Sequence, residues 1–143
     1  MKALLEAIMS LFSVFRRGNP QGNVPSPRYI INIPIPEPYK ATTVQNTNSM
    51  EPLLDVGHTV ILKPLDDLLP SEGDIIIWEK NGKSVIHSVI EVDTDTGGWY
   101  CRTQGLNLYR SDPDKIRLSE VKWLVVGVLW TKGTGYYAAG EGD

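Results

Sequence analysis

The sequence is short of the residues on which several kinds of site depend. Cys101 is the only cysteine among 143 residues, so a single chain forms no internal disulfide and no cysteine-based zinc site. Two histidines, His58 and His87, are too few for most imidazole metal sites, and we expect neither a metal nor a cofactor. Cys101 itself is expected to be a small buried hydrophobic residue.

The sequence also lacks an excess of charge of one sign. It has 14 Lys and Arg against 17 Asp and Glu, a formal net charge of −3, and both signs are mixed along the chain. Because nucleic-acid binding needs a basic surface, we exclude DNA and RNA as partners. The apolar fraction of 41% suits one globular domain with a core, while 10 prolines and 13 glycines favour the many turns of a β-rich fold.

A long hydrophobic run is missing as well. Apolar residues recur at three- and four-residue spacings from Leu4 to Phe15, which predicts an amphipathic helix over residues 1–17, ended by Gly18. At about 1.5 Å per residue its apolar part reaches about 20 Å, less than the roughly 30 Å of a bilayer core. No small-x-small cleavage site follows it. We therefore expect docking on this domain, on a partner protein or in the plane of a membrane surface, in preference to a span or a cleavable signal peptide.

What is present predicts a mainly β domain over residues 28–132, after a linker at 18–27 and before a flexible tail at 133–143. Asn81-Gly82 is a strong hairpin signal. The proline-studded segment 29–39 should be an edge strand or a polyproline segment. Apolar and alternating runs predict roughly six or seven mostly antiparallel strands, among them residues 59–62, 75–78, 84–90, 99–103 and 124–130.

Three blocks of this chain carry residues suited to nucleophilic catalysis. The first has Ser49 before Met-x-Pro, followed by a turn that ends in Gly57 and by an apolar strand. The second begins at Gly73-Asp74, passes through the Asn-Gly hairpin and returns with His87 on the second strand. The third runs from Thr103 to Asp112. A serine hydroxyl is a weak nucleophile that needs a base and donors for the developing oxyanion, and an imidazole is suited to be that base.

In this order the blocks resemble the signal peptidase and SOS repressor-like serine protease superfamily. The match covers about residues 43–130 and is closest to the histidine-base branch, the endoplasmic-reticulum-type and archaeal-type signal peptidases. The resemblance implies a compact, mostly antiparallel β-domain with Ser49 as nucleophile, His87 as general base and Asp112 as the carboxylate that orients the base.

The resemblance also suggests roles for residues beside the serine. The Ser49 N–H and the Thr47 hydroxyl would stabilise the oxyanion, although Thr47 equally suits a plain turn. Met50 and Pro52 would shape the turn and floor of the substrate-binding site. Asp114 is an alternative to Asp112 with a less suitable offset, and His58, after the turn glycine, is not expected to be catalytic.

Two functions follow from these observations. The first is a serine endopeptidase that cleaves an extended polypeptide, which includes self-processing, with the 29–39 segment lining or occluding the groove. The second is a catalytically silent structural or assembly module, for example in a phage particle, that retains the β-fold. Gln104, Leu106 and Leu108 stand where the family has polar residues, which suits the second. The sequence does not reveal the compartment; a membrane-peripheral and a virion-associated location are both compatible with it.

Overall fold

The computed structural model describes residues 26–132 of the chain. The predicted helix at 1–17, most of the predicted linker and the predicted tail at 133–143 lie outside the described residues. The described part is mainly β, as predicted, and its only helical element is the short 3-10 turn η1 (Leu118–Glu120). No helix within residues 26–132 has the length and apolar character needed to cross a membrane.

Seven strands form one antiparallel sheet in the order β1-β2-β7-β3-β4-β5-β6. Their bounds are β1 (Lys40–Thr43), β2 (Thr59–Lys63), β3 (Ile75–Lys80), β4 (Lys83–Asp95), β5 (Gly98–Gln104), β6 (Ile116–Arg117) and β7 (Val121–Leu129).

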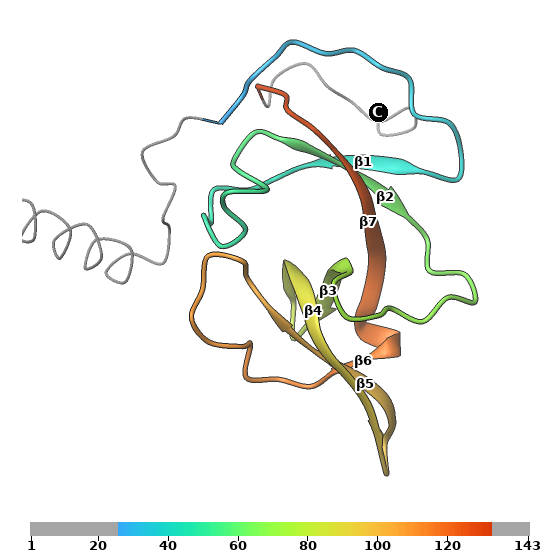
Figure 1. Cartoon of the computed structure of the whole chain (residues 1–143). Helices are drawn as coiled ribbons and strands as arrows, with labels where there is room; N and C mark the ends of the chain where they lie inside the picture. The colour runs from blue at the N-terminus through green and yellow to red at the C-terminus, as the bar shows by residue number, and fades with distance from the viewer. Residues whose placement is uncertain (1–25, 133–143) are drawn as a thin grey trace, which may run out of the picture.

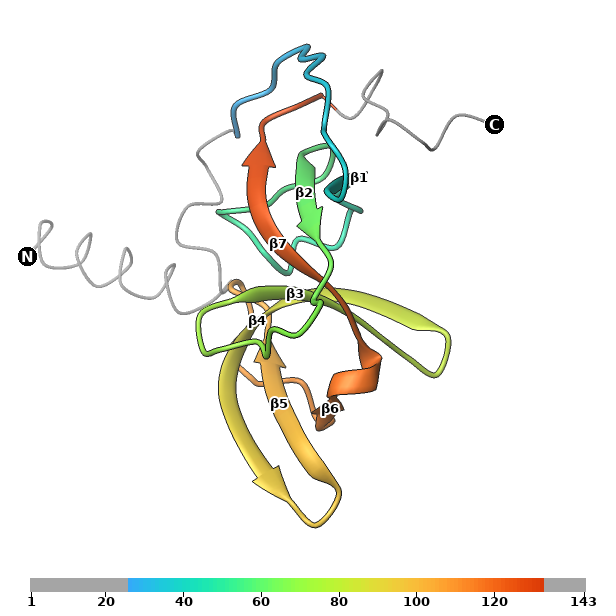
Figure 2. The ribbon, with the colours of Figure 1, turned by 90° about the vertical axis from the view of Figure 1, so that its right-hand side faces the viewer.

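Strand β7 joins the two halves of this sheet. Its first residues pair with β3 and its last residues with β2, and Val125 has a partner on each side. Figures 1 and 2 show the long, curved strand β7 running from the upper half, with β1 and β2, to the lower half, with β3 to β6. The strong coiling of the sheet lets it enclose more than one apolar core.

Alternation along β3 supplies both main cores. Ile76 and Trp78 are buried in the lower core with Val89 and Cys101. Ile75 and Ile77 instead pack against the upper core, which contains Met50, Leu54, Val60 and Leu62. Apolar residues at consecutive positions are thus explained by a strand with both faces covered.

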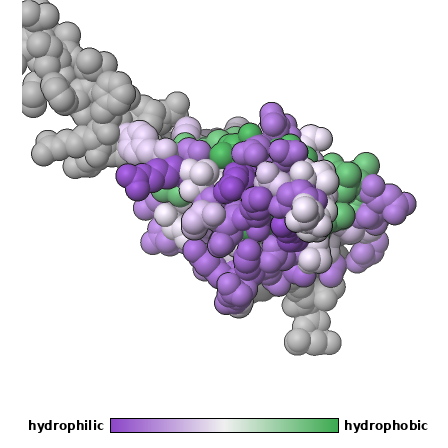
Figure 3. Space-filling model, turned by 90° about the horizontal axis from the view of Figure 1, so that it is seen from below, coloured by the Kyte–Doolittle hydropathy of each residue, from purple (hydrophilic) through white to green (hydrophobic). Residues whose placement is uncertain are grey.

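From below, the surface is mostly hydrophilic, with apolar residues towards its margins (Figure 3).

The hairpin between β3 and β4 forms where the sequence predicted it. Asn81 has φ +52° and Gly82 has φ +73°, so both adopt the left-handed conformation that a tight hairpin turn requires. The returning strand β4 is longer than predicted and extends to Asp95, since its second half pairs with β5.

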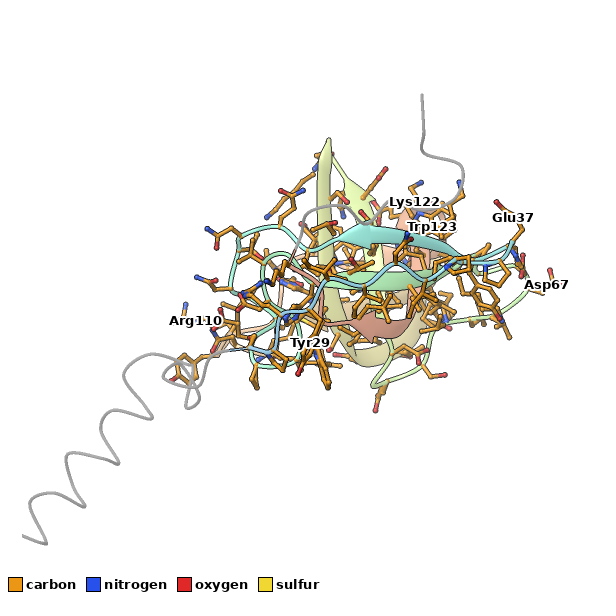
Figure 4. The ribbon with its side chains drawn as sticks, turned by 90° about the horizontal axis from the view of Figure 1, so that it is seen from above. Tyr29, Glu37, Asp67, Arg110, Lys122 and Trp123 are labelled. Atoms are coloured by element: carbon orange, nitrogen blue, oxygen red, sulfur yellow. The ribbon has the colours of Figure 1, made fainter. Side chains whose placement is uncertain are left out.

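The segment 29–39 is a strap rather than a strand of the sheet. Within it Tyr29 forms a single bridge to Thr131, and Ile35 packs into a small core with Ala41. Figure 4, seen from above, shows the labelled residues Tyr29 and Glu37 well apart. The edge strand is β1, formed by residues 40–43, because these residues pair with β2 and the prolines of the strap do not.

Candidate active site

Ser49, His87 and Asp112 meet at one point of the structure. The Nε2 atom of His87 lies 3.1 Å from the Ser49 hydroxyl oxygen, and its Nδ1 atom lies 2.6 Å from Oδ2 of Asp112. The side chains of His87 and Asp112 are 8% and 15% exposed, so the carboxylate contact is largely shielded from water. With a proton on Nδ1, Nε2 is left as the acceptor that faces the serine hydroxyl.

Each of the three side chains is held by a different kind of element. His87 lies on β4, opposite Ile76 of β3, in the middle of the sheet. Ser49 lies in the turn that follows β1, next to Asn48, whose φ of +58° places it in the left-handed region. The side chain of Met50, 2% exposed, anchors that turn in the upper core.

Asp112 lies in the irregular segment between β5 and β6, and the start of this segment contacts the serine turn. The backbone N–H of Asn107 donates to the Ser49 carbonyl at 2.9 Å, and its side-chain amide donates to the Asn48 carbonyl at 2.9 Å. A Cβ atom on Gly105 would lie 2.5 Å from the Ser49 carbonyl oxygen and 3.0 Å from Nε2 of His87. Asn107 and Gly105 therefore help to fix the position of Ser49.

Sequence reasoning gave these two residues no role. Both belong to the third block, but neither is a titratable group, and a glycine that only makes room leaves no chemical signal in one sequence. The stretch Leu106 to Arg110 also offered no indication that the backbone N–H of Asn107 would be used.

The surroundings of Ser49 contain two donors for an oxyanion. The hydroxyl of Thr47 lies 3.2 Å from the Ser49 hydroxyl oxygen. Within residues 26–132 the backbone N–H of Ser49 is not used in a hydrogen bond to a backbone carbonyl of a turn or loop. Since charge that develops on a carbonyl oxygen is stabilised by preorganised donors, both groups are available for that task.

A groove of about 640 Å³ leads away from the three groups. One wall is β1 with the residues that follow it, and the other is the part of β4 from Lys83 to His87. Its apolar lining includes Val60, Leu62, Ile77 and Ile86, and its remaining residues include Trp123. Figure 4 labels the lining residue Trp123.

Of the residues predicted beside the serine, Thr47 lines the groove, whereas Met50 and Pro52 do not. Met50 is buried in the core beneath the serine turn, and the part that Met50 and Pro52 take in the floor of the site stays a prediction. No residue of 29–39 lines the groove, which removes the idea that the strap occludes it. Asp114 makes a long ion pair with Lys80 at 3.9 Å, so Asp112 is the carboxylate that reaches His87.

His58 has a structural role next to the serine turn. Its Nδ1 accepts the Asp55 N–H at 3.2 Å and its Nε2 lies 3.1 Å from the Pro27 carbonyl oxygen. With 1% of the residue exposed, His58 ties Pro27, two residues before the strap, to the turn after Ser49. Both ring nitrogens are thus occupied, as expected for a non-catalytic histidine.

A small charged cluster strengthens the same junction. Arg28 and Ser26 both contact the Asp55 carboxylate, at 2.9 and 3.1 Å. Burial acts to raise the pKa of Asp55, but the hydrogen bonds from Val56 N–H and Ser26 and the charge of Arg28 outweigh it, and the pKa is lowered. Burial and the neighbouring Asp55 raise the pKa of Glu51.

Within residues 26–132, no group of three or more His, Cys, Asp or Glu side chains is arranged to hold a metal ion.

Comparisons with known proteins leave the chemistry of the site to be argued from its geometry. No protein-family model matches this sequence, and a search of curated proteins finds no match to it.

Proposed function

We propose that this protein is a serine endopeptidase in which Ser49 is the nucleophile, His87 the general base and Asp112 the residue that orients the base. The observation that carries the proposal is the single imidazole that bridges a hydroxyl at 3.1 Å and a carboxylate at 2.6 Å. The first distance is within the range expected of a nucleophile and its base. The resemblance of the three blocks to histidine-base signal peptidases supports the same assignment.

The reaction begins when the Ser49 oxygen attacks the scissile carbonyl carbon. Its proton passes to Nε2 of His87, and the imidazolium that forms is stabilised by Asp112 through Nδ1. The carbonyl π electrons move to the oxygen, where the Ser49 N–H and the Thr47 hydroxyl donate hydrogen bonds. Collapse of this intermediate breaks the C–N bond, the leaving amine takes the proton from Nε2, and water hydrolyses the acyl-enzyme by the same steps with His87 again as base.

The substrate we propose is an extended polypeptide that lies in the groove. Strand β1 is the terminal strand of the sheet and pairs with β2 on one side only, so its other backbone edge can pair with a peptide. The edge borders the groove along Lys40–Thr43 and leads towards Ser49. Backbone pairing would then align the peptide, and the groove would select its side chains.

The test uses a degenerate peptide library, with products identified by mass spectrometry. We expect wild-type protein to cut at defined bonds and Ser49→Ala to lose at least about 10³-fold of that activity while retaining its fold. Asp112→Asn should also lose activity, because an amide does not select the Nδ1–H tautomer as a carboxylate does. Cleavage that survives in Ser49→Ala would overturn the assignment of the nucleophile.

A second function has one observation in its favour. Leu106, Leu108 and Tyr109, beside Asp112, are 47%, 42% and 65% exposed, and such apolar surface suits a contact with another protein. We propose as the alternative that the domain is a catalytically silent assembly module. A folded wild-type protein that cuts no library peptide and not its own chain would favour this alternative.

A further inference from the structure

A buried chain of hydrogen bonds stands behind Asp112. The Thr103 hydroxyl donates to Oδ2 of Asp112 at 2.5 Å, and the indole N–H of Trp78 donates to the Thr103 hydroxyl oxygen at 3.1 Å. Thr103 is 0% exposed and Trp78 4% exposed, so water does not compete for these bonds. The chain crosses from β3 to β5 and ends on the residue that contacts the base.

The direction of the chain follows from the chemistry of its members. An indole N–H can only donate, so the Thr103 oxygen accepts from Trp78 and its own proton is free for Asp112. The same Oδ2 atom of Asp112 also receives the Nδ1–H of His87. In addition, the backbone N–H of Asp112 donates to the Thr103 carbonyl at 2.8 Å. Thr103 is thus hydrogen-bonded to Asp112 through both its main chain and its side chain.

The hydrogen bonds from Thr103 are needed because Asp112 is on irregular backbone between β5 and β6. A side chain there is less constrained than one on a strand, whereas a catalytic carboxylate acts only while it stays within hydrogen-bond reach of the imidazole. Thr103, opposite Val89 of β4, and Trp78, opposite Val85, both lie on paired strands. Through these two side chains, the paired strands can therefore restrict the movement of Asp112 in its loop.

We propose that Thr103 and Trp78 are positioning residues that hold Asp112 against Nδ1 of His87 and so fix the tautomer of the base. The proposal rests on the proposed peptidase function for its kinetic consequence, but the effect on the imidazole is independent of any substrate. Neither residue touches the groove, since neither is among its lining residues, so their removal should affect the chemical step and leave binding unchanged.

The experiment compares Thr103→Val, Thr103→Ser and Trp78→Phe with wild-type protein. Valine keeps the shape of threonine without the hydroxyl, serine keeps the hydroxyl, and phenylalanine keeps an aromatic ring without the N–H. On a peptide that the wild type cleaves, we expect Thr103→Val to lower kcat about 10²-fold with KM within about twofold, because a misplaced orienting group costs on this order. We expect Thr103→Ser to restore most of kcat, and Trp78→Phe to lower it about tenfold.

The second readout is the tautomer of His87, measured from the ring ¹⁵N shifts in the neutral state. The chain has only two histidines, so a His58→Phe spectrum suffices to assign the signals. Wild-type protein and Thr103→Ser should show a proton on Nδ1, whereas Thr103→Val should show a mixture of tautomers.

Thr131→Val is the matched control. Thr131 is a buried threonine, 2% exposed, whose hydroxyl contacts Thr59 and the Gly57 carbonyl away from the catalytic groups. It should lose stability yet keep both kcat and the His87 tautomer. An unchanged tautomer and an unchanged kcat in folded Thr103→Val would overturn the proposal. If instead the wild type cleaves nothing while Thr103→Val still mixes the tautomers, the peptidase function fails and the positioning role stands.

Discussion

Replacing Gly105 by alanine should inactivate the proposed active site by moving Ser49. The new Cβ atom would lie 2.5 Å from the Ser49 carbonyl oxygen, a backbone atom that cannot turn aside, and 3.0 Å from Nε2 of His87. No positive φ is involved, so the effect is purely steric. To reach an ordinary contact of 3.4 Å, Gly105 and the serine turn must separate by about 0.9 Å, the difference from 2.5 Å.

A separation of this size affects both folding and the reaction. Overpacking of this kind costs about 1–3 kcal/mol of folding free energy. A misplacement of about 1 Å in a catalytic arrangement costs on the order of 10²-fold in rate, or about 2.7 kcal/mol of activation free energy. The Asn107 N–H bond to the Ser49 carbonyl would be strained by the same movement.

The assay pairs kcat on a cleaved peptide with the urea-unfolding free energy of the same variant. Gly127→Ala is the control, because its Cβ would come no closer than 3.3 Å, to the flexible end of Ile61. We expect Gly105→Ala to lose about 10²-fold in kcat and remain folded, and Gly127→Ala to keep full activity. A folded Gly105→Ala with wild-type kcat would refute the steric reasoning and the serine's assigned position.

Three further predictions concern the surroundings of the site. The pKa of Asp55 is lowered in the folded protein, so this carboxylate contributes folding free energy above the ordinary carboxyl pKa of 3.8, and the contribution is lost as pH falls through the folded pKa. Asp55→Asn should lower the free energy of unfolding by about 1 kcal/mol near neutral pH. In urea unfolding at several pH values, the variant should also lose less stability than the wild type as the pH is lowered. Burial, followed by the charge of Glu120, raises the pKa of Cys101 to about 11, so only about one thiol in a thousand is ionised at pH 8. Ellman's reagent should therefore react far more slowly with native than with urea-unfolded protein. His58→Phe leaves the Asp55 N–H and the Pro27 carbonyl without their partner and should cost about 2 kcal/mol by urea unfolding, while Ser49-dependent cleavage persists.

Local signals in the chain located the strands around the site. The Asn81-Gly82 turn, the apolar run at 75–77 and the alternation around His87 all report on short-range preferences, and β3 and β4 formed where these signals lie. For 29–39 the sequence left an edge strand and a polyproline segment open, and of these the edge strand does not form there, because the edge strand of the sheet is β1. Pairing with β2 selected residues 40–43, and pairing is a property of two segments.

The positions of Ser49, His87 and Asp112 were also named from the order of three blocks, but their convergence depends on the sheet. The serine turn and Asp112 come together because β1 and β4 border one groove and because Asn107 bonds to the turn. Gly105 shows the limit most clearly. Because Gly105 has no Cβ atom, its backbone can approach the carbonyl of Ser49, which lies 56 positions away in the sequence. Nothing in the neighbours of Gly105 along the chain reveals that approach.

The amino-acid sequence by itself determined the β-rich class, the hairpin and the chemical identity of the three groups, since propensity, turn chemistry and side-chain type are local properties. Only the tertiary structure decided which carboxylate meets His87, which glycine makes room for Ser49, and that Thr103 and Trp78 stand behind Asp112. These are contacts between segments brought together by strand pairing, and their distances are set by the coiling of the whole sheet.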